Sequence, residues 1–343
     1  MPRPTPAPPR ISVVVLTRDR AGQLVGTLAR LTSLPEQPPV FVADNASCDD
    51  TVKLVDMLFP QVRVVQCCAD LGAAARNRAV ACVRTDYVAF CDDDSWWEAG
   101  SLARAVKLLD GAPQVAVLSA RVIDGTSGIT DPACARMAAS PLTVPGWPEP
   151  ALAGYLAGAC VFRTAVFRAV GGYEPRLVIG GEEALVALDV LSAGHAIGYC
   201  RELTVRRTAP VVRDDGAVRA NDCERAADHG PRRDDDVALR RRLLARNAAW
   251  VAWLRLPWLE VCRTTFGALA MFAREHALWR DGRKMIGGLG WALANRHRVS
   301  AQVLAMRAEV RAAERRLARG GLRADRDAQH AKHTVAEPRS HDH

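Results

Sequence analysis

Four short apolar runs, each separated from the next by a stretch of helical periodicity, constrain the fold of this chain more than any other feature. The first, residues 11–17, is continuous and β-branched, as expected of a strand covered on both faces of a parallel sheet. Similar runs occupy residues 40–43, 62–66 and 87–91. Strands that alternate with helices at this spacing predict an α/β fold built on a doubly wound, mostly parallel sheet.

The fourth run ends in three consecutive aspartates, Asp92, Asp93 and Asp94. Neighbouring carboxylates repel one another, because two unit charges ~4 Å apart cost ~4 kcal/mol at an effective dielectric of about 20. The triplet is therefore either a solvated acidic turn or a site for a cation. We favour a cation bound together with a diphosphate, since open α/β sheets bind ligands at the carboxyl ends of their strands and carboxylates suit Mg²⁺ or Mn²⁺. No G-x-G-x-x-G follows any of the runs, which argues against a dinucleotide-dependent dehydrogenase.

Polar residues follow the other predicted strands as well. Asp44 and Asn45 come directly after the second strand, and Gly72 comes shortly after the third. Ser47 and Asp50 have the spacing of a capping box, which predicts the start of the next helix. The carboxyl edge of the predicted sheet is thus lined by acids and amides.

The second half of the chain brings a further pair of carboxylates. Residues 124–150 are rich in Pro, Gly, Ser and Ala and are predicted to form a long loop near an acceptor, and residues 156–162 are predicted to form a strand. Glu182 and Glu183 then follow two glycines and open an apolar helix. They either complement the helix dipole or take part in chemistry.

The basic charge of the chain is local. The net charge is +8, but residues 240–320 contain seventeen Arg and Lys against five Asp and Glu, which is +12 and leaves −4 for the rest. We therefore expect no nucleic acid as partner. Arginine together with tryptophan on helices is typical of a segment lying in a membrane interface, while a helical bundle packed on the α/β core is an equally good interpretation. No apolar run reaches the ~20 residues of a spanning helix.

The cysteines and the N-terminal residues indicate in which cellular compartment the protein is expected. The ten cysteines form no C-x-x-C pair and most lie in apolar runs, so we interpret them as reduced core residues rather than zinc ligands or disulfides. Residues 1–10 are proline-rich and contain no apolar signal-peptide region. A cytoplasmic protein is expected, with peripheral attachment to the inner face of the plasma membrane as an option.

Six short motifs in order carry a family resemblance. They are Val13-Val-Val-Leu-Thr-Arg-Asp-Arg20, Val42-Ala-Asp-Asn-Ala-Ser47, Leu71-Gly-Ala-Ala-Ala-Arg-Asn77, Phe90-Cys-Asp-Asp-Asp94, Val170-Gly-Gly-Tyr173 and Gly181-Glu-Glu183. On these motifs the chain resembles the inverting family 2 glycosyltransferases with the GT-A fold, particularly the bacterial rhamnosyltransferase-like members.

The resemblance implies roles for individual residues. The nucleobase would be held by Thr17, Asp19 and Asp44, with Arg76 near the base or the diphosphate. Asp92 would face the ribose and, with Asp94, the Mg²⁺ or Mn²⁺ ion, assisted by Asp93. Glu183 matches the catalytic base, and Glu182 beside it is the alternative.

The chain departs from the family pattern in three places. Glutamate stands where aspartate is the common base, Leu185 replaces an acidic residue, and Arg206 and Arg207 stand where many members have a histidine. An arginine there could contact phosphate through its planar fork.

The resemblance implies a metal-dependent inverting transferase that moves a sugar from a UDP- or dTDP-linked donor to a hydroxyl of a cell-envelope glycan or lipid-linked acceptor. The rival interpretation is an inactive, nucleotide-binding scaffold of envelope glycan assembly. A nucleotidyltransferase would want a Gly-rich first loop, which residues 17–20 lack.

The expected domain organisation has five parts. They are a disordered N-terminus (1–10), a glycosyltransferase domain (11–213, with donor half 11–122 and acceptor half 123–213), a flexible linker (214–236), a basic helical region (237–320) and a disordered tail (321–343).

Overall fold

The computed structural model describes residues 8–208 and 233–334 of the chain. The ends of the predicted N-terminus and tail lie outside these ranges. So does the predicted linker, except for residues 233–236, which begin a helix.

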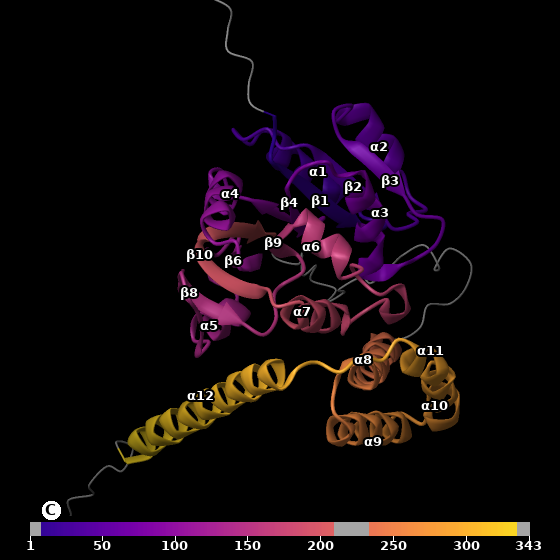
Figure 1. The fold of residues 1–343 in the computed structure, drawn as a ribbon, viewed down its shortest axis with the longest axis vertical. Helices are drawn as coiled ribbons and strands as arrows, with labels where there is room; N and C mark the ends of the chain where they lie inside the picture. Colours follow the sequence, from indigo (N-terminus) through magenta and orange to yellow (C-terminus); the bar gives the residue numbers. More distant parts are fainter. Residues whose placement is uncertain (1–7, 209–232, 335–343) are drawn as a thin grey trace, which may run out of the picture.

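The architecture is a mixed sheet with helices around it and a separate layer of C-terminal helices (Figure 1). The strands are β1 (Ile11–Thr17), β2 (Val40–Asp44), β3 (Arg63–Gln66), β4 (Tyr87–Asp92), β5 (Ser95–Trp97), β6 (Val115–Asp124), β7 (Leu142–Val144), β8 (Trp147–Leu152), β9 (Ala159–Arg163) and β10 (Ala196–Arg207). The α-helices of the sheet-containing part are α1 (Ala21–Thr32), α2 (Thr51–Leu58), α3 (Ala75–Cys82), α4 (Ser101–Gly111), α5 (Pro132–Ala138), α6 (Thr164–Ala169) and α7 (Glu182–Ser192). The C-terminal layer contains α8 (Arg233–Arg255), α9 (Trp258–Arg274), α10 (Leu278–Gly287), α11 (Leu289–Ala294) and α12 (Ala301–Thr334).

The strand order is β3-β2-β1-β4-β9-β6-β10-β8-β7, with β5 paired to β10. The first four strands run parallel to one another, as predicted, and Val13, Val14 and Val15 of β1 are fully buried because helices cover both faces. Strand β9 lies antiparallel between β4 and β6. The predicted α/β fold with a mostly parallel central sheet and a C-terminal helical region is confirmed, with antiparallel strands added to that sheet.

Three local predictions were wrong. The predicted 124–150 loop contains α5, β7 and β8, and α5 starts with Pro132 after Asp131, whose side chain accepts a hydrogen bond from the Ala133 N–H at 2.8 Å. This is an ordinary helix start that the loop-like composition concealed. Ser47 makes no capping box, because its hydroxyl accepts a hydrogen bond from the Asp19 N–H instead.

The third error concerns the last helix. The basic helical region was predicted to end at residue 320, before a disordered tail, but α12 continues to Thr334. Two glycines cost a helix only about 1 kcal/mol each, and no proline follows within it to stop it. The predicted start of the tail at residue 321 is therefore helical.

The cysteine interpretation holds in part. The nine described cysteines are all free. Cys91, Cys134, Cys160 and Cys200 are buried as core residues, whereas Cys48, Cys68 and Cys262 are exposed and do not belong to the core.

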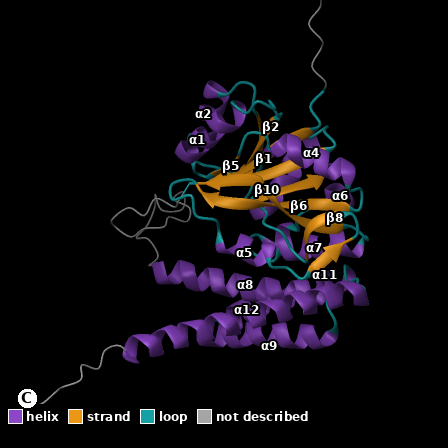
Figure 2. Ribbon diagram, turned by 90° about the vertical axis from the view of Figure 1, so that its left-hand side faces the viewer, coloured by secondary structure: helices purple, strands orange, loops and turns teal. Residues whose placement is uncertain are grey.

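Helix α7 lies between the sheet and the C-terminal layer (Figure 2). Asp189 of α7 forms an ion pair with Arg255 of α8, in which the Arg255 Nη2 donates to Asp189 Oδ2 at 3.0 Å. Trp250 and Trp253 of α8 are buried in the interface with the neighbouring helices. The bundle interpretation thus describes α8 well. None of the helices in residues 8–208 and 233–334 is at once long and apolar enough to cross a membrane.

Candidate functional site

The site lies at the carboxyl ends of the parallel strands. Thr17 at the end of β1 is in register with Asp44 of β2, and Leu16 is in register with Asp92 of β4. The chain winds from β1 outward to β3 and then returns to β4 on the other side of β1, so the strand order reverses between β1 and β4. A cavity of about 530 Å³ opens at this switch point, where open α/β sheets bind ligands. We call it the donor cavity.

Asp93 is the buried member of the triplet. Its two carboxylate oxygens accept hydrogen bonds from Thr17 Oγ1 and Arg20 Nη1, both at 3.0 Å. Its backbone carbonyl accepts a third from Thr27 Oγ1 at 2.7 Å. Burial raises the pKa of Asp93 to about 6, although the charge and hydrogen bonds of its partners oppose the rise. Asp93 is thus tied to β1 and α1 by groups that leave it little capacity for another ligand.

Asp92 pairs with Arg76 across the donor cavity. Arg76 on α3 is almost fully buried, with its guanidinium 5.9 Å from the centre of the Tyr173 ring, and its Nη2 contacts Asp92 Oδ1. Half of the Asp92 side chain remains exposed to the cavity. Gly158 allows this arrangement, because a Cβ there would lie 2.3 Å from Asp92 Oδ2.

Asp94 is the least committed carboxylate of the three. It lines the donor cavity, and the nearest cation is Arg20, 3.6 Å from its Oδ2. Burial and the charge of Asp92 raise the pKa of Asp94, while Arg20 and Arg207 lower it.

The carboxylates of the donor cavity are candidate ligands for a divalent ion. In the described part of the chain no group of three or more His, Cys, Asp or Glu gathers as a ligand cluster. Asp92 and Asp94 offer hard oxygen atoms to one cavity, and Mg²⁺ or Mn²⁺ typically needs only one or two carboxylates when substrate phosphates complete its coordination. The residues present therefore fit such an ion if a phosphate-bearing substrate is bound with it.

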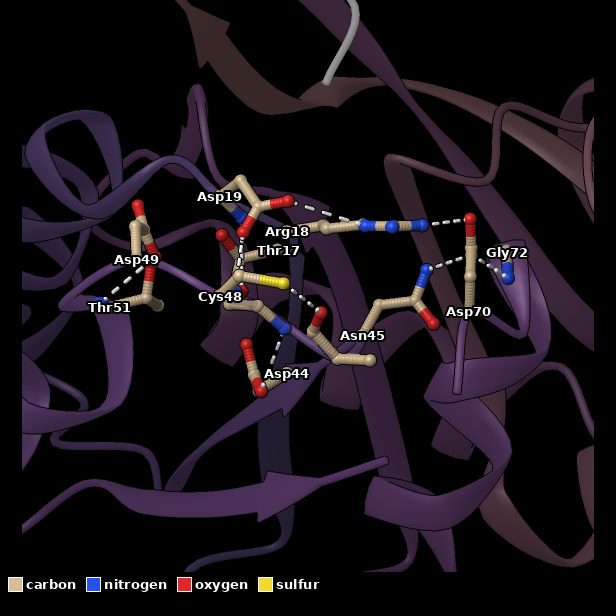
Figure 3. Close-up of polar contacts among 12 residues, drawn as sticks. Thr17, Arg18, Asp19, Asp44, Asn45, Cys48, Asp49, Thr51, Asp70 and Gly72 are labelled. Carbon is tan, nitrogen blue, oxygen red and sulfur yellow. Dashed lines mark hydrogen bonds and ion pairs between the residues drawn. The ribbon is translucent and has the colours of Figure 1, made fainter. Parts of the chain in front are cut away.

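Asp19 and Asp44 are not among the residues that line the donor cavity, and their contacts are with neighbouring loop residues (Figure 3). Asp19 has a φ of 53° and accepts a hydrogen bond from the Cys48 N–H at 2.6 Å. Asp44 is 2% exposed and accepts a hydrogen bond from the Ser47 N–H at 3.3 Å, while its Oδ1 is buried without a partner. Both carboxylates brace the loop after β2, and neither lines the cavity.

Three residues to which the family resemblance gave no role line the donor cavity where Asp19 and Asp44 were expected. Arg18 reaches between Asp19 and Asp70, and Asp70 Oδ1 also accepts a hydrogen bond from Asn45 Nδ2 at 2.6 Å (Figure 3). Arg18, Asn45 and Asp70 all line the donor cavity. Their positions in the motifs after β1, β2 and β3 were the signal that could have identified them.

The two glutamates form the opposite side of the cavity. Glu183 Oε1 accepts a hydrogen bond from the Ala157 N–H at 2.8 Å. Burial raises the pKa of Glu183, and the negative charge of Glu182 adds to the rise. Burial also raises the pKa of Glu182. Glu182 lines only the donor cavity, whereas Glu183 also lines a second cavity of about 370 Å³. Glu183 is thus the carboxylate at the junction of the two spaces.

Arg206 and Arg207 do not line either cavity that Glu183 borders. Arg206 pairs with Glu98, and Arg207 Nη2 donates to Asp131 Oδ2 at 2.7 Å. Arg240 of α8 lines the donor cavity together with Arg18, Arg20 and Arg76, and sequence reasoning missed it because it lies beyond the linker, far from every motif.

Helix α8 also holds the segment that precedes the glutamates. The side-chain amide nitrogen of Asn247, fully buried, lies 2.5, 2.9 and 2.7 Å from the carbonyl oxygens of Leu177, Ile179 and Gly180. Gly180 and Gly181 have positive φ and pack against α8, where a Cβ on Gly180 would lie 2.1 Å from Leu244 Cδ2. The two glycines are needed both for the turn and for this close approach.

The sequence of this chain is similar to those of known proteins. Residues 12–170 match the model of a family described as glycosyl transferase family 2. The N-acetylglucosaminyl-diphospho-decaprenol L-rhamnosyltransferase of Mycobacterium tuberculosis, found in two strains, is 26% identical over 200 residues. The match covers 48% of this chain and 65% of the relative, so the chain spans just under two thirds of that protein's length.

Two solved structures share the fold. The mannosyltransferase PcManGT from Pyrobaculum calidifontis, solved with GDP-Man and Mn²⁺, is 20% identical with a TM-score of 0.50, covering 90% of this chain and 87% of its own. GalNAc-T7, solved with UDP, GalNAc and Mn²⁺, is 14% identical with a TM-score of 0.51, covering 71% and 48%. Residues 12–170 are thus similar to glycosyl transferase family 2, and the likeness to these two structures shows that the chain has the predicted GT-A-type fold.

Proposed function

We propose that this protein is an inverting glycosyltransferase that uses a nucleotide-diphosphate sugar. The observation that carries the proposal is the position of Glu183, a partly buried carboxylate between the donor cavity, with its aspartates and arginines, and a second cavity. A direct displacement needs this arrangement, because donor and acceptor must meet at one base.

The donor cavity offers groups of both signs for a nucleotide diphosphate. Arg76, Arg20 and Arg240 supply positive charge for the phosphates, which arginine binds through its planar fork. Thr17, Asn45 and Asp70 supply donors and acceptors at the nucleoside end. Asp19 and Asp44 would then act by holding the nucleoside loop in shape, and Asp93 by holding Thr17 and Arg20.

A divalent ion held by Asp94 and Asp92 would neutralise charge on the leaving diphosphate. This part of the proposal is supported by the donor set and by two neighbours of the same fold that were solved with Mn²⁺.

The base carries out the remaining step. Glu183 takes the proton of an acceptor hydroxyl, whose oxygen forms a bond to the anomeric carbon while the bond from that carbon to the diphosphate oxygen breaks. The proton then passes from Glu183 to solvent. The raised pKa of Glu183 makes it a stronger base than an exposed glutamate, which suits proton transfer near neutral pH.

The finer identity of the substrates is proposed from similarity. A UDP- or dTDP-linked deoxyhexose or hexose as donor and a lipid-linked envelope glycan as acceptor agree with the rhamnosyltransferase relative, whose named acceptor is a sugar on a diphospho-lipid.

A membrane surface as partner is supported by the C-terminal layer. Trp258, Leu259 and Phe266 of α9 and Trp279 and Ile286 of α10 are exposed by 59, 81, 70, 84 and 61% respectively. Leu259 and Phe266 of α9, and Trp279 and Ile286 of α10, are each seven residues apart and therefore lie on one face of their helix; basic residues are interspersed with them, the composition of an interfacial helix.

Binding and turnover measurements test the proposal. Thermal-shift measurements with UDP or dTDP should show stabilisation that depends on Mn²⁺ or Mg²⁺, and nucleotide-sugar hydrolysis should follow the same metal dependence. Stabilisation without hydrolysis, and without transfer to any acceptor, would favour the scaffold alternative. No stabilisation by any nucleotide would contradict both.

A further inference from the structure

The second cavity, on the other side of Glu183, has mainly apolar walls. It lies between α5, residues 152–156, the start of α7, and α12. Met137, Leu152, Tyr155 and Val310 are among its lining residues. It has about 370 Å³ of space, within the range of small-ligand sites. We call it the acceptor cavity.

One wall of the acceptor cavity carries a cation without a counterion. Arg307 of α12 is partly buried and makes no hydrogen bond or ion pair with the described residues. Burial and the charge of Arg311 lower the pKa of Arg307, while the charge of Glu260 raises it. Arg311 also lines the cavity but is engaged by Glu260, with Arg311 Nη1 3.2 Å from Glu260 Oε1. A partly buried guanidinium without an anion is costly, so a bound anion would relieve an unfavourable state.

The lining of the acceptor cavity includes a second cation that forms no ion pair within the described residues. Arg136 of α5 lines the cavity and has no hydrogen bond or ion pair with any described residue. The carboxylates that line the same cavity are Glu183, at the junction with the donor cavity, and Glu314, which is exposed. Two arginines from elements about 170 residues apart in sequence thus line one largely apolar space, and neither forms an ion pair with a carboxylate of the described residues.

We propose that Arg136 and Arg307 bind a phosphate or diphosphate group of the acceptor, and that the acceptor cavity holds this group close to the hydroxyl that is glycosylated. The proposal rests on the proposed function, since it takes Glu183 as the base. The apolar walls fit the carbon skeleton on either side of the phosphate, whether a sugar ring or the first part of a lipid. Because Arg307 belongs to α12, the C-terminal layer would then take part in acceptor selection.

Calorimetric titration of the full-length protein with two synthetic probes tests this directly. The probes are N-acetylglucosaminyl undecyl diphosphate and undecyl N-acetylglucosaminide, which differ in the diphosphate. The titrations are made in EDTA, so that metal-assisted binding of a diphosphate in the donor cavity is suppressed. The wild-type protein should bind the diphosphate probe at least ~10-fold more tightly, as one or two charge-assisted contacts allow.

Three variants separate the specific effect from a general one. Arg307→Gln and Arg136→Gln should each weaken binding of the diphosphate probe about 10-fold and leave binding of the glycoside unchanged. Arg315→Gln is the matched control, because Arg315 is on the same helix, exposed and not among the residues that line the cavity. It should bind both probes as the wild type does. Arg136 is exposed, so its variant keeps the test valid even if Arg307→Gln proves unstable.

The outcomes are distinct. Equal wild-type affinity for the two probes, or unchanged diphosphate binding in both variants, would overturn the proposal. If the proposal is overturned but the protein still hydrolyses nucleotide sugars in a metal-dependent way, the assignment of Arg136 and Arg307 is wrong and the proposed function is unaffected. If arginine-dependent binding is found but no nucleotide is bound or hydrolysed, the proposed function is wrong and the anion site stands. A further titration with N-acetylglucosamine 1-phosphate identifies the source: binding as tight as that of the lipid probe indicates a soluble phosphate, and weaker binding a lipid-linked one.

Discussion

At the scale of single residues, three adjacent carboxylates have three different surroundings. Asp93 is held by Thr17 and Arg20, Asp92 is paired with Arg76, and Asp94 keeps only a longer contact with Arg20. The triplet is therefore not a solvated acidic turn, because arginines from two other elements neutralise part of its charge. These differences predict separate effects on stability and on turnover.

Replacement of Asp94 by Ala should abolish turnover while the fold is retained. We expect nucleotide-sugar hydrolysis to fall at least ~100-fold and the metal-dependent thermal shift with UDP or dTDP to disappear, since a charge-stabilising group is lost. Asp93→Asn is the contrasting variant. It should lower the free energy of unfolding by about 1–3 kcal/mol in urea titrations, because it weakens buried hydrogen bonds. If the Asp94→Ala variant keeps full activity, Asp94 is not a metal ligand.

Glu182 and Glu183 should respond differently to pH. Glu183 acts as a base only when ionised, so kcat/KM should rise with pH through a pKa above the ordinary value of glutamate. Glu182→Gln removes a negative charge that raises this pKa. It should therefore shift the acidic limb of the profile to lower pH and preserve activity at neutral pH.

Glu183→Gln should remove transfer, by about 10²–10⁴-fold, while metal-dependent donor binding remains. An active Glu183→Gln together with an inactive Glu182→Gln would instead make Glu182 the base.

At the scale of elements, α8 determines the conformation of the segment that leads into α7. Val178 has a φ of 43°, which is unfavourable for a β-branched residue, and its carbonyl lies where a Cβ of Gly72 would be only 1.7 Å away. Asn247 provides the amide group that faces the carbonyls of this strained turn. Helix α8 of the C-terminal layer thus helps to position Glu183 through the turn that precedes it.

Asn247→Ala should weaken this support. The carbonyls of residues 177, 179 and 180 would lose their buried partner, which should cost about 1–3 kcal/mol of unfolding free energy. The turnover number should fall more than the KM for donor changes, because Glu183 is misplaced and the nucleoside contacts are untouched. Leu239→Ala, an exposed position on the same helix, is the control and should change neither quantity. Wild-type stability and turnover in Asn247→Ala would show that α8 does not support the turn.

At the scale of the whole molecule, the C-terminal layer contributes to both cavities. Arg240 of α8 enters the donor cavity and Arg307 of α12 the acceptor cavity. The outward faces of α9 and α10 carry the exposed tryptophans and leucine. A single layer therefore connects the substrate sites with the surface proposed to meet a membrane.

Sedimentation with vesicles tests that surface. The protein should co-sediment with phosphatidylglycerol-containing vesicles at low salt and less at high salt, since basic residues contribute to binding. The double substitution Leu259→Ser and Trp279→Ser should weaken binding about 10-fold or more, because two large apolar groups are lost. Ile129→Ser is the control, since Ile129 is 68% exposed but lies in the sheet-containing part. Absence of binding at either salt concentration would exclude the interfacial surface.

Much of this protein could be predicted from local sequence. The four parallel strands are short runs whose β-branched residues fit only a buried strand, and the polar residues that end them must lie at one edge of the sheet. This was enough to place Asp92 and Asp94 at one site, while the family resemblance added Thr17 and Glu183. The short strands in residues 124–150 were missed because β8 also pairs with β10, about 45 residues further along the chain, and because the composition of the β7–β8 hairpin resembles that of a loop.

The amino-acid sequence by itself determined the sheet, its ligand-binding edge and the chemical types of the groups there, because these follow from side-chain periodicity and from where each strand ends. Only the tertiary structure decided which of those groups face the cavity. It turned Asp19 and Asp44 away from the cavity, tied the buried Asp93 to Thr17 and Arg20 at the cavity wall, left Asp94 accessible, and brought Arg240 and Arg307 to the substrate cavities from beyond residue 232. The physical reason is that exposure and charge pairing depend on packing between elements that are far apart in the chain, and no local pattern specifies that packing.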